Sequence, residues 1–213
     1  MNILEQIAAQ TRERIEAEKR QTPTEELIRQ IEATEQKKSK RSFYEALKKP
    51  GMSYICEVKK ASPSKGLIAS DFPYLDIARE YEAAGASAIS CLTEPFRFLG
   101  KDAYLQEIAA QVEIPVLRKD FTVDEYMIYQ ACLLGASAVL LICAILDDAQ
   151  LRAYRELAES LGMDALVEAH DEHELEAALD AGAQPAAVVA GVAADGTADG
   201  HGKIICRIAV VQQ

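Results

Sequence analysis

The sequence predicts an α/β fold of the (β/α)8 TIM-barrel class, incomplete at about six strand–helix units and preceded by an N-terminal helical extension. Short apolar strands alternate with amphipathic helices from residue 53 onward, which is typical of a parallel sheet buried on both faces. The phrase GASA joins a helix to a strand twice, at 85–88 and 135–138, so the unit repeats. Polar residues gather where the strands end, and the strand ends of a barrel converge on one mouth.

Residues 1–52 are predicted to form the helical extension. Apolar and charged residues follow a helical period over 2–20. In the next segment, TPTEELIRQIEATE, we expect Thr22 to be the N-cap, Pro23 to be the first helical residue and Glu25 to close a capping box. A short third helix, FYEALKKPG, completes the extension.

Residues 53–192 are predicted to form the barrel portion. Its strands are expected at 54–59, 86–93, 114–120, 136–146, 164–170 and 185–192. Its helices are expected at 71–85, 101–112, 123–135, 147–162 and 171–182. Six strands are fewer than the eight of a closed barrel of this kind. Residues 193–213 read as an aberrant Gly/Ala-rich tail in which only IICRIAVV could form another strand.

An open doubly wound sheet is the alternative architecture. In such a sheet the carboxyl ends of the strands would lie in a row along one edge, whereas in a barrel they surround one opening. The polar residues at those ends are Glu57, Lys59, Thr93, Glu94, Arg118, Lys119 and Glu168. So many charges at the ends of different strands favour the barrel, in which they would surround one site.

Acid–base chemistry is the function that these charges indicate. Glu57 and Lys59 are two residues apart on a strand, so both side chains point the same way. Lys119 and Glu168 end two other strands, each after an apolar run. Proton donors and acceptors facing each other across a mouth suit a reaction with more than one proton transfer. A purely structural Lys–Glu network is the alternative.

Composition limits the partners of the chain. Its 34 acidic residues outnumber its 23 basic residues, for a net charge of -11 that repels nucleic acid and anionic membranes. The basic run KKSKRS at 37–42 therefore reads as a solvated linker. The opening segment lacks the apolar core of a signal peptide, and the five cysteines are scattered without a CxxC pair. We therefore expect a cytoplasmic protein with small buried thiols and no membrane or nucleic-acid partner.

Several phrases resemble one enzyme family. CEVKKASPSKG is followed in order by SCLTEP, PVLRKDF, LLGASAVLLI and LVEAHDEHEL, and together these resemble indole-3-glycerol phosphate synthase over about residues 2–184. The resemblance implies a carbon–carbon lyase of tryptophan biosynthesis. It implies a phosphorylated small-molecule substrate, 1-(2-carboxyphenylamino)-1-deoxyribulose 5-phosphate, which is decarboxylated and dehydrated as its ring closes. No cofactor or metal is implied.

The resemblance also implies residue roles. Lys119 matches the general acid that protonates the substrate carbonyl, and Lys59 matches the lysine that holds the substrate carboxylate and assists dehydration. Glu168 matches a carboxylate used in proton removal, and Glu57 one that orients the site. Ser62 lies on the first loop, which the family uses as a mobile lid near the substrate. Apolar positions around the substrate's aromatic ring match Phe98, Phe121 and Leu140.

The C-terminal part departs from the family pattern. After Gln184 the chain reads PAAVVAGVAADG where the family has a GVNNR-like segment, and no ESGI-like or GES-like phosphate loop follows. We expect a disrupted reading frame, a chimeric join or a mis-assigned gene end. An inactive barrel fragment is therefore an alternative function, and a different phosphate-binding barrel isomerase is another. The charged set Glu57, Lys59 and Lys119 speaks against the isomerase.

Two further expectations follow from the residues. His170 and His173 form an HxxH, but without a third ligand we expect no metal there and assign Asp171 and Glu174 to a helix start. An open six-strand sheet would leave its first and last strands unpaired, so we expect self-association through these edges.

Overall fold

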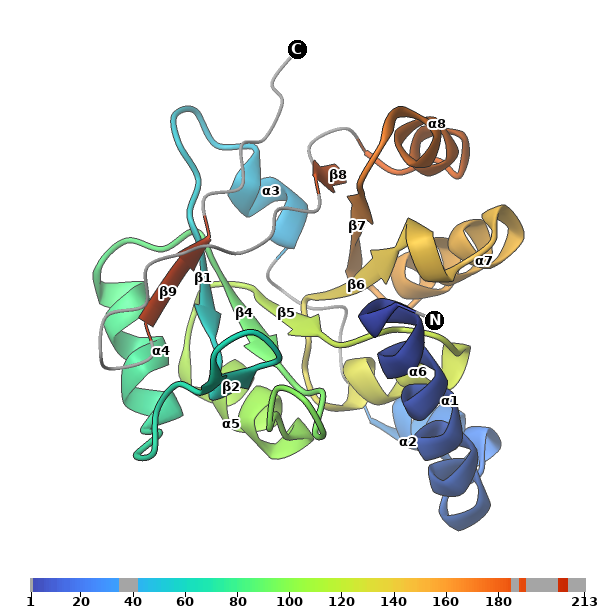
Figure 1. Ribbon diagram of the computed structural model, residues 1–213, viewed down its shortest axis with the longest axis horizontal. Helices are drawn as coiled ribbons and strands as arrows, with labels where there is room; N and C mark the ends of the chain where they lie inside the picture. The colour runs from blue at the N-terminus through green and yellow to red at the C-terminus, as the bar shows by residue number, and fades with distance from the viewer. Residues whose placement is uncertain (1, 35–41, 185–187, 191–202, 207–213) are drawn as a thin grey trace.

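The computed structural model describes residues 2–34, 42–184, 188–190 and 203–206. Within these residues seven strands form one sheet in the order β8-β7-β6-β5-β4-β1-β9 (Figure 1). Neighbouring strands from β1 to β8 run parallel, as the sequence predicted. These parallel strands are β1 (Ile55–Val58), β4 (Ala88–Leu92), β5 (Val116–Lys119), β6 (Ala138–Ile142), β7 (Asp164–Ala169) and β8 (Val188–Ala190). The fold is that of the α/β TIM-barrel class, built from the predicted strands.

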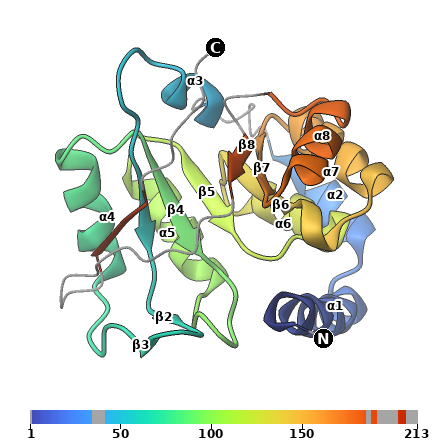
Figure 2. The ribbon, with the colours of Figure 1, turned by 45° about the horizontal axis from the view of Figure 1, so that its top comes forward.

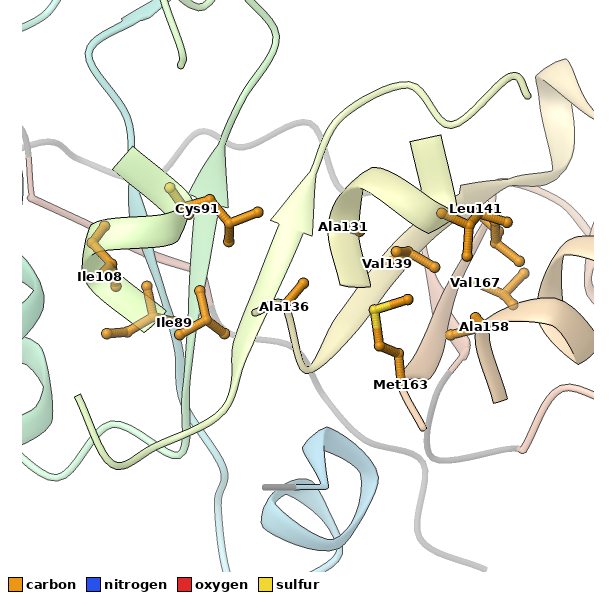
Figure 3. Close-up of a cluster of buried hydrophobic side chains, with 14 of the residues drawn as sticks. Ile89, Cys91, Ile108, Ala131, Ala136, Val139, Leu141, Ala158, Met163 and Val167 are labelled. Carbon is orange, nitrogen blue, oxygen red and sulfur yellow. The ribbon is translucent and has the colours of Figure 1, made fainter. Parts of the chain in front are cut away.

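The strands are apolar on both faces because each face has its own core. Alternate residues of a strand point to opposite faces. The outer face packs against the helices in one large cluster (Figure 3). It carries Cys56, Val58, Ile89, Cys91, Val116, Val139, Leu141 and Val167. The inner face has a second cluster, with Ile55, Ala88, Leu117, Ala138, Leu140, Ile142 and Leu166.

Each crossover helix begins and ends where the sequence indicates. The helices are α4 (Tyr74–Ala83), α5 (Asp102–Gln111), α6 (Glu125–Leu133), α7 (Asp148–Ser160) and α8 (Glu172–Asp180). Side chains of Asp124, Asp147 and Asp171 cap α6, α7 and α8 by accepting backbone N–H bonds. The start of α8 therefore uses Asp171 as predicted.

The repeated GASA phrase has a structural reason. Gly85 and Gly135 follow α4 and α6 with φ of 89° and 80°, a conformation that glycine adopts without strain. The serine two residues later accepts a hydrogen bond from the start of the preceding strand. Tyr54 N donates to Ser87 Oγ at 3.2 Å, and Val116 N donates to Ser137 Oγ at 3.3 Å. The phrase thus ends one helix and aligns the next strand with its neighbour.

The N-terminal helices pack on α6. Helices α1 (Ile3–Gln21) and α2 (Thr24–Ala33) share a buried cluster with α6. The predicted N-cap of the second helix is wrong, because Thr22 instead ends α1: its N–H donates to Glu18 O. Its own carbonyl accepts from Tyr126 Oη at 3.0 Å. Pro23 occupies the N-cap of α2, without a side-chain cap bond.

A third helix, α3 (Phe43–Leu47), lies at the end of the sheet where the strands begin. Phe43 and Leu47 are both 1% exposed and belong to the inner-face cluster. Figure 2 shows α3 at this end and α1 at the opposite end, where the strands finish. One end of the inner face is therefore closed by apolar side chains. The predicted basic linker lies almost entirely outside the described residues.

The edge of β1 is not open, which corrects an expectation. Strand β9 (Lys203–Cys206) pairs with it antiparallel, from Ile55 opposite Cys206 to Val58 opposite Lys203. The physical reason is that the apolar, β-branched start of IICRIAVV suits a sheet edge. The other parts of the predicted tail lie outside the described residues, as do residues 185–187 and 191–192 of the last predicted strand. No helix among the described residues is long and apolar enough to cross a membrane.

Candidate active site

Four predicted site residues share one face and one end of the sheet. Glu57 lies two residues after the inner-face residue Ile55, and Lys59 follows in the same alternation. Lys119 follows Leu117 in the same way, and Glu168 follows Leu166. These charges therefore lie on the inner face where the parallel strands end. Active sites of barrels are built at this end.

Glu57 and Lys59 form a buried ion pair. Lys59 Nζ lies 2.6 Å from Glu57 Oε1, and the side chains are 7% and 5% exposed. Such a pair persists because each charge offsets the desolvation of the other. An ammonium has three donors, so Lys59 can bind an anion while it stays paired with Glu57. The pair provides a fixed positive group in an acidic protein.

Ser90 is a polar residue of this face that the sequence analysis missed. It lies opposite Glu57 on the neighbouring strand and is 4% exposed. Its hydroxyl is buried and makes no hydrogen bond among the described residues. A small serine within an apolar strand gives no sequence signal that separates it from a packing residue.

Lys119 and Glu168 form a second, more open pair. Lys119 Nζ lies 3.8 Å from Glu168 Oε2, with the side chains 32% and 19% exposed. This distance allows an ion pair but is too long for a hydrogen bond. An ammonium and a carboxylate so placed can donate and accept protons on one molecule between them.

His170 connects Glu168 to helix α8. Its Nε2 lies 3.4 Å from Glu168 Oε1, and its Nδ1 lies 3.3 Å from Glu174 Oε2. Glu174 Oε2 also accepts from the backbone N–H of His170 at 2.7 Å. Among the described residues no group of three or more His, Cys, Asp or Glu side chains is placed to hold a metal ion. The sequence analysis considered this histidine only as a metal ligand and missed its contact with Glu168.

Thr93 and Arg118, two other polar residues at strand ends, face away from this site. Thr93 Oγ1 donates to Asp120 Oδ2 at 2.8 Å and accepts from Arg118 Nε at 3.2 Å. Arg118 Nη2 also donates to Asp102 Oδ1 at 2.8 Å. The side chain of Asp120 is fully buried. Arg118 and Asp120 flank Lys119 in sequence, so their side chains point to the opposite face and Lys119 remains on the inner face.

The loop after β4 carries Phe98, whose ring lies near that of Phe121. The Phe98 ring centroid lies 6.2 Å from that of Phe121, with the planes inclined by 38°. Phe121 packs against the cluster that contains Leu140. Phe98 therefore lies beside Phe121, and Phe121 packs on the inner-face cluster that includes Leu140. A flat apolar substrate ring suits such a wall.

Glu94 holds this loop in place. Its buried carboxylate accepts backbone N–H bonds from Phe96, Arg97 and Phe98 at 2.7–2.9 Å. Leu99 has φ of 52°, which is uncommon for a residue with a side chain. Contacts with the surrounding residues are needed to hold the backbone in such a conformation.

Ser62 lies on a short hairpin between β1 and α4. Strands β2 (Ala61–Ser62) and β3 (Gly66–Leu67) pair antiparallel. Ser62 Oγ accepts from Lys65 N at 3.2 Å and lies 3.4 Å from Ser64 Oγ. The hydroxyl therefore stabilises the turn, and Figure 2 shows the hairpin at the end where β1 finishes.

Cys91 and Cys143 both have raised thiol pKa values. Cys91 lies in the outer-face core, and burial raises the pKa of its thiol above the ordinary value. Burial, followed by the nearby Glu174, raises the pKa of Cys143 to about 11. Neutral thiols are poor nucleophiles, so these two act as small apolar residues.

Comparison with known proteins agrees with the geometry. A family model described as indole-3-glycerol phosphate synthase matches residues 4–192. The chain belongs to the indole-3-glycerol phosphate synthase family. The match extends past Gln184, where the sequence analysis expected the resemblance to stop.

Curated relatives carry the same name. The indole-3-glycerol phosphate synthase of Ruminiclostridium cellulolyticum is 52% identical over 182 residues, and that of Endomicrobium trichonymphae is 54% identical over 182 residues. In both cases the match covers 85% of this chain and 70% of the relative. Among solved structures, a crystal structure of KGPDC from Streptococcus mutans is 13% identical with a TM-score of 0.48, covering 63% of each chain. That likeness is too weak to bear on function.

Proposed function

We propose that the chain is a carbon–carbon lyase with indole-3-glycerol phosphate synthase activity in tryptophan biosynthesis. The family membership supports this activity. The substrate, 1-(2-carboxyphenylamino)-1-deoxyribulose 5-phosphate, carries a carboxylate, an aromatic ring and a phosphate. The observation that best supports the proposal is the juxtaposition of two Lys–Glu pairs with an apolar aromatic wall at one end of the sheet.

In the proposed reaction Lys119 is the general acid. Its ammonium donates a proton to the substrate carbonyl oxygen as the aromatic carbon attacks the carbonyl carbon. Phe98, Phe121 and Leu140 hold the aromatic ring, and Ser62 keeps the first loop folded beside it. The proton donor and the ring wall lie on the same strand end, since Phe121 is two residues after Lys119.

Lys59 and Glu168 act on the groups that leave. Lys59 binds the substrate carboxylate, which departs as carbon dioxide, and then assists loss of the hydroxyl group as water. Glu57 pairs with Lys59 and stabilises positive charge that develops on the substrate. Glu168 removes the proton whose loss completes the dehydration. The reaction needs two proton donors or acceptors in addition to the Glu57–Lys59 pair. Lys119 and Glu168 supply them.

A second candidate function is a catalytically inactive barrel fragment. The family match ends at residue 192, and the lack of a family-type phosphate loop in residues 193–213 favours it. The purified chain, given the carboxyphenylamino substrate, should form product detectable by indole fluorescence. Its rate should exceed that of a Lys119→Ala variant by roughly 10²–10⁴, the usual contribution of general acid–base catalysis. Equal rates for the two proteins would support the inactive fragment.

Two properties of the protein belong to the same proposal. A cytoplasmic location suits a biosynthetic lyase whose four described cysteines are free. The outward edges of β8 and β9, which end the sheet among the described residues, offer backbone groups for pairing with a second copy. Light scattering that shows a monomer at all concentrations would contradict this self-association.

A further inference from the structure

His170 lies between two carboxylates at the end of strand β7. Its Nε2 is 3.4 Å from Glu168 Oε1, and its Nδ1 is 3.3 Å from Glu174 Oε2. The side chain is nevertheless 42% exposed. The ring therefore joins the proposed base to solvent on one side and to helix α8 on the other.

Helix α8 provides the hydrogen-bond partner of one ring nitrogen of His170. Glu174 N donates to Asp171 Oδ1 at 2.8 Å, and Glu174 Oε2 accepts from His170 N at 2.7 Å. His170 Nδ1 hydrogen-bonds with Glu174 Oε2 at 3.3 Å, so the relay uses the neutral ring form that has its proton on Nδ1. Nε2 is left as the nitrogen that can accept a proton, and it faces Glu168.

We propose that His170 receives the proton that Glu168 removes from the substrate and passes it to solvent. This inference rests on the proposed function. Glu168 first takes the proton and becomes a carboxylic acid. The O–H bond at Oε1 then breaks as an N–H bond forms at Nε2, which regenerates the carboxylate and gives an imidazolium. The imidazolium releases the proton to water, and no electrons are gained or lost.

The surrounding charges suit this role. Glu168 from β7 and Glu174 from α8 flank the ring and offset the positive charge of the imidazolium. Lys119 from β5 contacts the other oxygen of Glu168, Oε2, so it leaves Oε1 to the histidine. From the short 3-10 helix η1 (Cys143–Ile145), the Cys143 thiol donates to the backbone carbonyl of Glu174 at 3.5 Å. Imidazole exchanges protons with water readily near neutral pH.

The alternative role is purely structural, with His170 holding Glu168 in place through a hydrogen bond. Two variants distinguish the roles. A His170→Gln side chain can still donate a hydrogen bond to Glu168, but it cannot carry a proton away. A His170→Ala side chain does neither. His173→Gln, on the exposed side of α8, is the matched control.

Steady-state product formation, with substrate in excess, should fall by roughly 10- to 100-fold in both His170→Gln and His170→Ala, below the ~10²–10⁴ of a direct general base, because Glu168 must lose its proton before the next turnover. Added imidazole should restore the rate of His170→Ala in proportion to its concentration, and His173→Gln should match the unmodified chain. A His170→Gln rate equal to that of the unmodified chain, or no rescue by imidazole, would overturn the relay alone. An unmodified chain that forms no product would overturn the proposed function and the relay with it.

A measurement on the free protein tests the position of the proton on the His170 ring, without a measurement of activity. Nitrogen-15 spectra of the histidine side chains should show a protonated Nδ1 for His170, and Glu174→Gln should alter this signal while leaving that of His173 unchanged. A His170 ring with an unprotonated Nδ1 would overturn the relay, since Nε2 would then hold the fixed proton.

Discussion

Lys119 Nζ lies 3.8 Å from Glu168 Oε2, although their strands are separated by a third strand, β6. The two side chains reach toward each other across the inner face, on which β6 presents the apolar Leu140. Because the contact is an ion pair without a hydrogen bond, a substrate can separate the two groups at modest cost. We therefore interpret the pair as the resting form of an acid and a base that act on one molecule.

Lys59→Met should selectively weaken binding of the substrate carboxylate. Hydrogen bonds to charged groups contribute about 1.5–3 kcal/mol, so the dissociation constant of a carboxylate-bearing analogue should rise about 10- to 100-fold. An analogue without the carboxylate should bind the variant and the unmodified chain equally. Lys60→Met removes the same charge one residue later and is the control. Equal weakening of both analogues would show that Lys59 does not contact the carboxylate.

Glu94→Ala should loosen the loop that carries Phe98. The substitution leaves three backbone N–H groups without their buried acceptor, and each unsatisfied group costs about 1–3 kcal/mol. We expect a lower melting temperature and a higher KM, because the aromatic wall is no longer fixed. Glu94→Gln keeps one acceptor oxygen, so its melting temperature and KM should lie between those of Glu94→Ala and the unmodified chain. An unchanged KM in Glu94→Ala would show that the loop does not contribute to substrate binding.

The strand and helix pattern could be predicted because each element follows a local rule. Continuous apolar runs mark strands buried on both faces, and GASA marks the glycine that ends a helix before the next strand. The N-cap at Thr22 failed for a tertiary reason. The carbonyl of Thr22 accepts from Tyr126 Oη, and its N–H continues α1, so packing on α6 outweighed a local capping signal.

The candidate site could be predicted only in part. Alternation along a strand places Glu57 beside Lys59, but which strand ends face each other depends on the sheet order. The bond of Arg118 to Thr93 could not be inferred from spacing, because the two residues are distant in sequence. The contact of His170 with Glu168 has the same i, i+2 spacing as Glu57 and Lys59, but the HxxH pattern drew attention to a metal instead. An HxxH pattern invites a metal interpretation, whereas the fold uses one of its histidines to join two carboxylates.

Asp120→Asn should strongly destabilise the protein. Asp120 is fully buried and accepts from Arg14 Nη2 at 3.1 Å and from Thr93 Oγ1 at 2.8 Å, so it links α1 to the end of β5. Removing one charge of a buried pair costs about 3–5 kcal/mol, to be measured by urea unfolding. Asp76→Asn breaks an exposed pair with Arg79 and should cost about 0–1 kcal/mol. Similar losses for the two variants would contradict the buried role of Asp120.

Alkaline pH should destabilise the fold through Cys91. Burial raises the pKa of this thiol above its ordinary value of 9.0, so the folded protein keeps the proton that the unfolded chain loses. The contribution is complete below pH 9 and disappears as the pH rises, by about 1.4 kcal/mol per pH unit. Unfolding free energies measured from pH 8.5 to 10.5 should therefore fall less steeply in Cys91→Ala. Ile89→Val, in the same core, should lower the free energy of unfolding at every pH without changing the slope. Parallel curves for the unmodified chain and Cys91→Ala would show that the thiol does not contribute.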